Sequence, residues 1–322
     1  MKKLILLSTI LIPASGALAA GYQLQEYTVT GLGRAMAGAG IMGDDYSALA
    51  FNPAGMHFAE KSGAQLGFIG VDLRSRVEGT QTTYTSKSGK DFTHIFRLLP
   101  STFGQYKLNE KTTLGLGLYT PFGLATDYRN NWFASAQGQY SGITVVDLTP
   151  AVSYQLTDML TIGAGINLQY AVAHLTGATY DNGWTDMKHA DDISVGYTVG
   201  LTLQPWKTTR FGLSYRSPVR HKLQGKDEGK AGSAATYFLD GKHDVYAKIV
   251  TPETIIFSAA QDIGSQWTLS GTARFTRWDR FHHLDIYQDN YPYAHTSYLK
   301  ISFSTLEAAR MAPSPAPWIS SG

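Results

Sequence analysis

Several segments of the chain alternate apolar and polar residues with a period of two. Segment 160–170 has leucine, isoleucine, alanine and tyrosine at even positions, with threonine, glycine, asparagine and glutamine between them. Segments 113–118, 193–203, 211–216 and 267–275 repeat this pattern. A period of two places alternate side chains on opposite faces of a β-strand. We predict about ten strands between Ser62 and Phe303, each near the roughly 9–11 residues that cross a bilayer at a tilt.

The connections between these segments alternate in length. Segments 107–111, 155–158 and 204–208 are short and polar, whereas 126–139, 178–192 and 226–242 are long. Outer-membrane barrels have this alternation, with the short turns on the periplasmic side. A soluble β-sandwich also alternates apolar and polar residues, but only 16% of the residues here are charged. We therefore predict an all-β fold, a transmembrane antiparallel β-barrel that covers residues 61–303.

The N-terminal region divides into two parts. Residues 1–19 contain two lysines, a short apolar run and a small-residue end, which is typical of a cleaved secretory signal peptide. Residues 20–60 are rich in glycine and keep no helical or strand period. Such a segment cannot build a core of its own, so we expect it to lie inside the barrel as a plug, or hatch.

Composition narrows the function. The net charge is +2, no cluster of Lys and Arg suggests nucleic acid, and an aromatic content of 12% suits the girdles of a barrel wall. There is no cysteine. We find no Gly-x-Ser-x-Gly motif and no zinc-protease helix, and we interpret His282 and His283 as solvated side chains. We expect no enzyme activity, no cofactor and no metal.

Three motifs in the glycine-rich segment carry a family resemblance. They are Gly21-Tyr22-Gln23-Leu24-Gln25-Glu26-Tyr27, Gly31-Leu32-Gly33-Arg34-Ala35 and Asn52-Pro53-Ala54-Gly55. Together they resemble the hatch of the FadL family of outer-membrane transporters for long-chain fatty acids and other hydrophobic compounds. The resemblance implies a barrel of about fourteen strands with the hatch in its lumen. It also implies capture of substrate at the outer loops, an internal pocket, and sideways exit at a kink in the third strand.

Candidate substrate-binding residues are aromatic side chains that border the first long connection: Tyr119, Phe122, Trp132, Phe133 and Tyr140. The alternative for each of them is a place in the aromatic girdle at the membrane interface.

Pro121 and Gly123 are the candidate strand kink, because proline donates no ladder hydrogen bond and glycine tolerates unusual dihedral angles. The alternative is an ordinary strand end followed by a long loop.

Candidate gating residues in the hatch are Gly33, Arg34, Asn52, Pro53, Ala54 and Gly55. Arg34 is also a candidate partner for a substrate carboxylate, and the alternative is a structural ion pair with Asp44 or Asp45. No arginine follows His174 and Gly177, where the family has a basic side chain, and this favours a neutral substrate.

Residues 304–322 change character, with prolines at 313, 315 and 317. About four strands are missing relative to the resemblance, so we hypothesise an incomplete barrel followed by an aberrant tail, from truncation or a frameshift. The expected partners are long-chain fatty acids or aromatic hydrocarbons, outer-membrane lipid and the barrel-assembly machinery, and we expect a monomer. The alternatives are a general diffusion porin for small solutes and a nonfunctional product.

Overall fold

The computed structural model describes residues 22–81, 87–128, 132–135, 138–178, 183–232, 240–280, 283–288 and 299–302. The predicted signal peptide at 1–19 and the predicted tail at 304–322 lie outside these residues. Among the described residues, no helix is long and apolar enough to cross a membrane.

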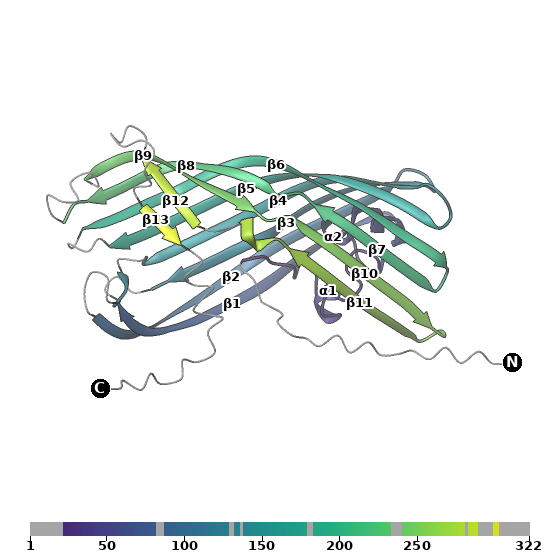
Figure 1. Ribbon diagram of the computed structural model, residues 1–322. Coiled ribbons are helices and arrows are strands. Elements are labelled where there is room, and N and C mark those ends of the chain that lie inside the picture. Colours follow the sequence, from purple (N-terminus) through teal and green to yellow (C-terminus); the bar gives the residue numbers. More distant parts are fainter. Residues whose placement is uncertain are drawn as a thin grey trace.

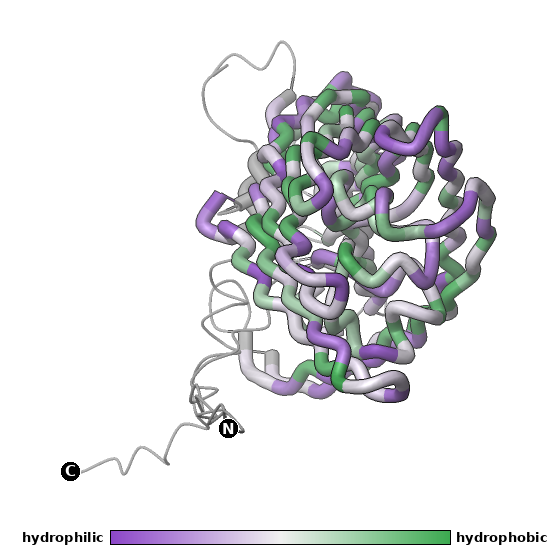
Figure 2. Tube along the Cα trace, turned by 90° about the vertical axis from the view of Figure 1, so that its right-hand side faces the viewer, coloured by the Kyte–Doolittle hydropathy of each residue, from purple (hydrophilic) through white to green (hydrophobic). Residues whose placement is uncertain are grey.

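In the part of the chain that the structure describes, thirteen antiparallel strands form one curled sheet (Figure 1). The strands are β1 (Gly63–Gln81), β2 (Lys87–Lys107), β3 (Thr112–Asp127), β4 (Tyr140–Gln155), β5 (Leu160–Ala178), β6 (Trp184–Trp206), β7 (Thr209–Arg216), β8 (Val219–Lys230), β9 (Gly241–Thr251), β10 (Thr254–Ile263), β11 (Trp267–Thr276), β12 (His283–Gln288) and β13 (Leu299–Ser302). Figure 2 shows the sheet end-on, curled around an interior that we call the lumen. Within the described residues β1 pairs with β2 alone and β11 with β10 alone, which leaves the curled sheet with free edges.

We call one crossing of the sheet from end to end a pass. Three passes consist of two consecutive strands each: β7 with β8, β9 with β10, and β11 with β12. Strand β6 pairs with β7 toward one end of the sheet and with β8 toward the other. On the far side of these two strands, β10 pairs with β7 and β9 pairs with β8. The interruptions contain Pro218 and Pro252, which cannot donate to a ladder. The pass from β11 to β12 is interrupted by the short helix η4 (Trp278–Arg280). With three double passes the thirteen strands make ten passes, which agrees with the prediction from the sequence.

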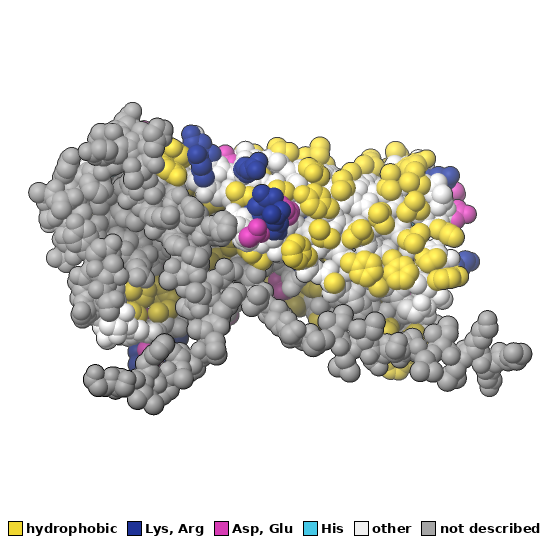
Figure 3. All heavy atoms as spheres, in the orientation of Figure 1, with side chains coloured by type: hydrophobic (Ala, Val, Ile, Leu, Met, Phe, Trp, Pro, Cys, Tyr) yellow, Lys and Arg dark blue, Asp and Glu magenta, His cyan; other side chains and the backbone are white. Residues whose placement is uncertain are grey.

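The two faces of the sheet have opposite chemistry. On β6 the outward side chains are apolar, and Ile193 and Val195 are 72% and 62% exposed, whereas Thr198 and Thr202 point into the lumen and are buried. Figure 3 shows apolar side chains covering most of the visible outer wall. Apolar side chains outside and polar ones inside are typical of a barrel in lipid. The predicted all-β antiparallel fold is confirmed.

The strands extend farther than the sequence predicted. Residues 184–192, predicted as part of a long connection, belong to β6, where Thr185 and Asp186 pair with Gly177 and Thr176 of β5. The prediction was wrong because these residues are charged and polar, whereas backbone pairing continues after the apolar alternation ends. A ladder needs no apolar side chains once it has left the lipid.

The N-terminal residues lie within the curve of the sheet (Figure 1) and contain α1 (Val29–Gly33), α2 (Ala48–Phe51) and the 3-10 helix η1 (Pro53–Phe58). Wall hydroxyls donate to hatch carbonyls: Ser101 to Tyr27, Ser214 to Phe51 and Ser258 to Ala39, at 2.6–2.8 Å. Since these serines come from β2, β7 and β10, the hatch is held from several sides of the wall.

Candidate functional site

The Asn52-Pro53-Ala54-Gly55 motif fixes the hatch to the wall. The Asn52 side chain accepts from the backbone N–H of Ala54 at 3.1 Å and donates to the Leu201 carbonyl of β6 at 3.0 Å. One amide therefore both caps η1 and ties it to the barrel. Pro53 occupies the first turn of η1, where a missing N–H costs nothing.

Glycines make room for this motif. A Cβ on Gly163 of β5 would lie 2.2 Å from the Ala54 nitrogen, and one on Gly200 of β6 would lie 2.0 Å from Asn52 Oδ1. Within the hatch, a Cβ on Gly55 would lie 1.6 Å from the Gly40 carbonyl oxygen. None of these positions has room for a side chain. The backbone of the wall strands therefore lies in direct contact with the Asn52 motif, and Gly55 lies in direct contact with Gly40.

The remaining two predicted gating residues have different surroundings. Arg34 forms an ion pair with Asp44, the structural alternative raised from the sequence, and its Nε donates to the Ala37 carbonyl at 3.3 Å. Gly33 is exposed, and a Cβ there would meet nothing within 4 Å. Its immediate contacts therefore give no reason for a glycine.

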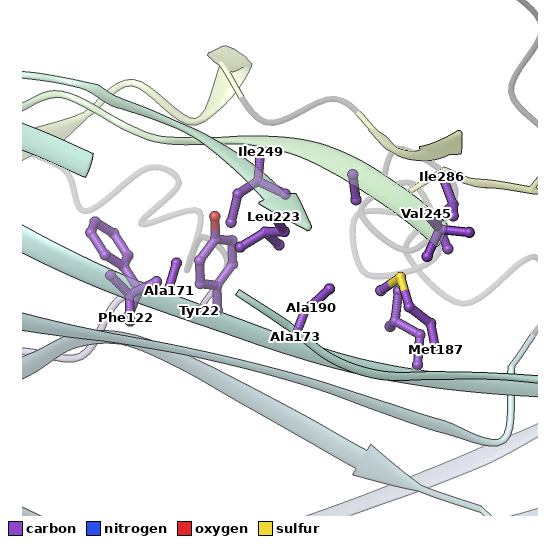
Figure 4. Packing of buried hydrophobic residues seen from close by; sticks show 13 residues of the cluster. Tyr22, Phe122, Ala171, Ala173, Met187, Ala190, Leu223, Val245, Ile249 and Ile286 are labelled. Carbon is purple, nitrogen blue, oxygen red and sulfur yellow. The ribbon is translucent and has the colours of Figure 1, made fainter. Parts of the chain in front are cut away.

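A row of apolar side chains lines the lumen from the hatch toward the long connections (Figure 4). We call it the lumen cluster, and it consists of Tyr22, Phe122, Val145, Ala171, Ala173, Leu175, Met187, Ala190, Leu223, Val245, Ala247, Ile249 and Ile286. Tyr22 and Phe122 stand at one end of the row, and Met187, Val245 and Ile286 stand at the other. Lumen-facing positions of a wet channel are polar, so this part of the interior suits an apolar molecule.

The predicted kink lies where β3 leaves β2. Pairing of the two strands ends at Thr102 and Leu118. Just beyond, two residues of β3, Thr120 and Pro121, stand opposite one residue of β4, which is the pattern of a β-bulge.

The N-terminal segment occupies the edge of β3 that this separation leaves. The Leu24 N–H donates to the Pro121 carbonyl and the Gly123 N–H donates to the Tyr22 carbonyl, both at 2.8 Å. Gln23 and Phe122 thereby form an isolated antiparallel bridge. Farther along, the Tyr27 carbonyl accepts from Ser101 of β2. Residues 22–27 therefore lie against both strands and supply pairing that β2 does not.

The five aromatic candidates fall into two groups. Tyr119 and Phe122 are fully buried; the Tyr119 ring packs 4.8 Å from the Tyr27 ring, and Phe122 belongs to the lumen cluster. Trp132, Phe133 and Tyr140 lie near the long-connection end. Trp132 stacks on Tyr128 at 4.4 Å, and Tyr140 lies 4.8 Å from the His174 ring. The structure thus places the first group beside the separation of β2 and β3, and the second group near the outer end.

Two further side chains of this region were missed from the sequence. Trp278 of η4 packs edge-on to Tyr22 at 5.3 Å and to Phe122 at 6.5 Å. Arg97 of β2 is exposed within the separated stretch and its Nη2 lies 3.4 Å from Tyr140 Oη. Arg97 sits at a lumen-facing position of β2, between buried Ile95 and half-buried Leu99, but residues 93–99 carry apolar side chains on both faces, so no period-two pattern pointed to it.

A buried ion pair lies beside Tyr119 on the lumen side of the wall. Arg216 of β7 contacts the Asp147 carboxylate of β4 through Nη2 and donates to Tyr119 Oη at 3.0 Å through Nη1. Asn167 contributes its amide to Asp147 at 3.4 Å and to Thr149 at 3.0 Å. The arginine is therefore neutralised within the wall, and Arg97 is the more accessible cation for an incoming molecule.

Comparison with known proteins identifies the family. The profile of the family described as "Outer membrane protein transport protein (OMPP1/FadL/TodX)" matches residues 10–308. The chain belongs to this family. The predicted membership and the outer-membrane location are therefore confirmed, and the family is one of transport proteins.

Individual relatives of the OMPP1/FadL/TodX family are distant in sequence. The chain is 26% identical to outer membrane protein P1 of Haemophilus influenzae, over 86% of this chain and 70% of the relative. It is 22% identical to the long-chain fatty acid transport protein of Salmonella typhi, over 85% and 70% of the two chains.

Solved structures support the fold. A FadL homologue of Pseudomonas aeruginosa superposes with a TM-score of 0.77 at 20% identity, over 88% of this chain and 74% of that one. The toluene transporter TbuX of Ralstonia pickettii gives 0.65 at 19% identity, over 83% and 75%. At these identities the likeness carries the barrel architecture and no detail of the site.

Proposed function

We propose that this protein carries hydrophobic compounds passively across the outer membrane, and that they leave sideways through the wall between β2 and β3. The relatives' names indicate two substrate classes, long-chain fatty acids and aromatic hydrocarbons. Capture takes place among Trp132, Phe133 and Tyr140, and transit follows the lumen cluster. A hydrophobic molecule gains nothing from a water-filled pore, whereas a wall opening delivers it directly to lipid.

The observation that carries the proposal is the bridge between Gln23 and Phe122. Residues 22–27 cover the separated stretch with two backbone hydrogen bonds to β3. Each such bond contributes a net ~1 kcal/mol, so the backbone pairing of this cover is much weaker than a full strand ladder. Tyr22 and Phe122 are also members of the lumen cluster. A molecule that travels along the cluster therefore meets the cover at its end.

Arg97 bears on the substrate class. Its guanidinium stands at the same end of the lumen as Tyr140, and a guanidinium binds a carboxylate through paired hydrogen bonds. A fatty acid would use this contact, whereas an aromatic hydrocarbon would not. Comparing oleate with toluene in an Arg97→Gln variant separates the two: loss of oleate uptake alone assigns the carboxylate to Arg97.

A covalent lock tests the sideways exit. The chain has no cysteine, so Gln23→Cys with Phe122→Cys introduces a single possible disulfide. The two flanking hydrogen bonds make this a non-hydrogen-bonded antiparallel pair, whose Cα atoms lie about 4.5 Å apart, within the range that a disulfide spans. Uptake of labelled oleate or toluene is measured in cells that lack their own transporter.

We expect uptake to fall at least about tenfold in the oxidised double variant, because the disulfide would hold the proposed exit closed, and to return on reduction. The Phe122→Cys single variant measures the cost of losing the ring. Equal uptake by oxidised and reduced protein would refute the sideways exit. Permeation of sugars through protein-containing liposomes that is insensitive to the lock would favour a diffusion porin instead.

A further inference from the structure

The outer faces of β8 and β9 carry a concentration of positive charge. Their exposed basic side chains are Arg220, Lys222, Lys226, Lys230, Lys242 and Lys248. The same faces carry the carboxylates of Asp244 and Glu228. These side chains point away from the lumen, because Leu223, Val245, Ala247 and Ile249 between them belong to the lumen cluster. Figure 3 shows basic groups where the apolar covering of the wall gives way.

Two of these lysines face each other across the strand pair. Lys222 and Lys248 are direct partners in the register of β8 and β9. Like charges in this position destabilise an antiparallel pair. Within the described part of the chain, no carboxylate oxygen lies within 4 Å of either ammonium group. Two exposed lysines thus share one spot on the wall, and among the described side chains no anion lies between them.

Two tyrosine rings lie next to the two lysines. The Lys222 Nζ lies 4.4 Å from the centroid of the Tyr246 ring, and the Lys248 Nζ lies 5.8 Å from Tyr246 and 5.7 Å from Tyr287. Tyr246 and Tyr287 stack at 5.0 Å with their planes 15° apart. Tyrosine on the outer wall of a barrel marks the level of the lipid headgroups. Cation–π contact holds the ammonium groups near that level.

The level can be estimated along the strand. Lys222 is the thirteenth residue after Thr209, where β7 begins at a short turn. At about 3.3 Å per residue and a tilt near 45°, it stands roughly 30 Å above that end. An apolar band is about 25 Å tall. The two lysines therefore lie just beyond the far edge of the hydrocarbon, on the side of the long connections, which is the outer leaflet.

We infer that Lys222 and Lys248, flanked by Tyr246 and Tyr287, form a binding site on the outer wall for the phosphate of an anionic glycolipid headgroup. The phosphate lies between the two ammonium groups and removes their mutual repulsion, and the tyrosine rings pack against the adjoining sugar or acyl chain. This site depends on the location of the barrel in the outer membrane and is independent of what the lumen transports.

Native mass spectrometry of the full chain in detergent micelles tests the site. The lipids are bisphosphorylated lipid A and the same lipid with its phosphates removed. We expect retained bisphosphorylated lipid on the wild-type protein and a dissociation constant about 30-fold weaker in Lys222→Gln/Lys248→Gln, because each basic side chain near an anionic lipid contributes roughly a fivefold factor.

A matched control removes the same charge elsewhere. Lys111→Gln/Lys207→Gln changes two exposed lysines at the short-turn end and should bind as the wild type does. Lys222→Arg/Lys248→Arg should keep the binding. The electrophoretic shift between heated and unheated samples confirms that each variant is folded.

Three outcomes would overturn the inference. They are equal affinity for the phosphorylated and the phosphate-free lipid, equal loss in the control pair, and a dimer of this chain that disappears in Lys222→Gln/Lys248→Gln. The last would make the spot a contact between copies.

Discussion

Replacing Arg216 with methionine should strongly destabilise the barrel. The Asp147 side chain is fully buried and the Arg216 side chain is 10% exposed, so neither charge is screened by solvent. Without the guanidinium, the Asn167 amide at 3.4 Å would be the remaining side-chain donor to Asp147 Oδ2 among the described residues. Removing one partner of a buried pair costs about 3–5 kcal/mol, because it leaves an uncompensated charge in a low-dielectric interior.

The same reasoning makes the double variant mild. Arg216→Met with Asp147→Leu removes both charges and leaves groups of similar volume, a change that is often neutral or stabilising. Tyr119 would lose one hydrogen bond but keep Thr149 at 3.3 Å. We expect the double variant to lie within about 1–2 kcal/mol of the wild type, so that the coupling between the two sites exceeds about 2 kcal/mol.

Urea unfolding in detergent micelles, followed by tryptophan fluorescence, measures these differences. With a slope near 3 kcal/mol per molar, the arginine variant should unfold at least about 1 M earlier than the wild type. If Arg216→Met keeps the wild-type midpoint, or if the double variant is as unstable as the single one, then the pair is not a desolvated charge pair and the argument fails.

The hatch offers two further tests. Gly55→Ala should destabilise the folded hatch by about 1–3 kcal/mol, because its Cβ would overlap the Gly40 carbonyl oxygen. Gly33→Ala should be neutral or slightly stabilising, because a Cβ there meets nothing within 4 Å. The rate of limited proteolysis in the hatch compares the two variants. Burial, followed by the charge of Lys107, lowers the pKa of His57, so the unfolded chain binds an extra proton as the pH falls through about 6.5 and stability is lost in that range. His57→Gln should reduce the difference between urea midpoints at pH 7.5 and pH 5.5, and an unchanged difference would assign it to other groups.

The regular part of this structure was predictable because it is local. Alternation fixed which side chains of β5 and β6 face the lumen, and small residues on that face, such as Gly163 and Gly200, are the ones that accommodate the hatch. The Asn52 motif carried its own cap, since the side chain bonds to a backbone N–H two residues later. The pairing of residues 184–192 with β5 was missed because these charged and polar residues do not alternate with apolar ones.

The site was predictable only in part, because it depends on contacts between distant segments. Nothing local places Trp278 beside Tyr22, or Arg216 beside Asp147. Likewise, a proline in a strand indicates a break but not what covers it, and the partner of Pro121 turned out to be Leu24, almost a hundred positions away. Each of these pairs exists only after the sheet has curled.

The interruptions of three neighbouring passes have a mechanical consequence. Ser217-Pro218 stands beside Pro252-Glu253, which in turn stands beside Arg277, because Arg216 pairs with Thr254 and Thr254 with Thr276. The breaks therefore lie side by side in three neighbouring passes, with β7, β10 and β11 on the side of the hatch and β8, β9 and β12 on the side of the lumen cluster. Glu253 joins two of these breaks, since its carboxylate accepts from Arg277 and Arg280 in the interruption between β11 and β12. We therefore expect the sheet to bend most easily at this level, because the ladder is interrupted there in three neighbouring passes.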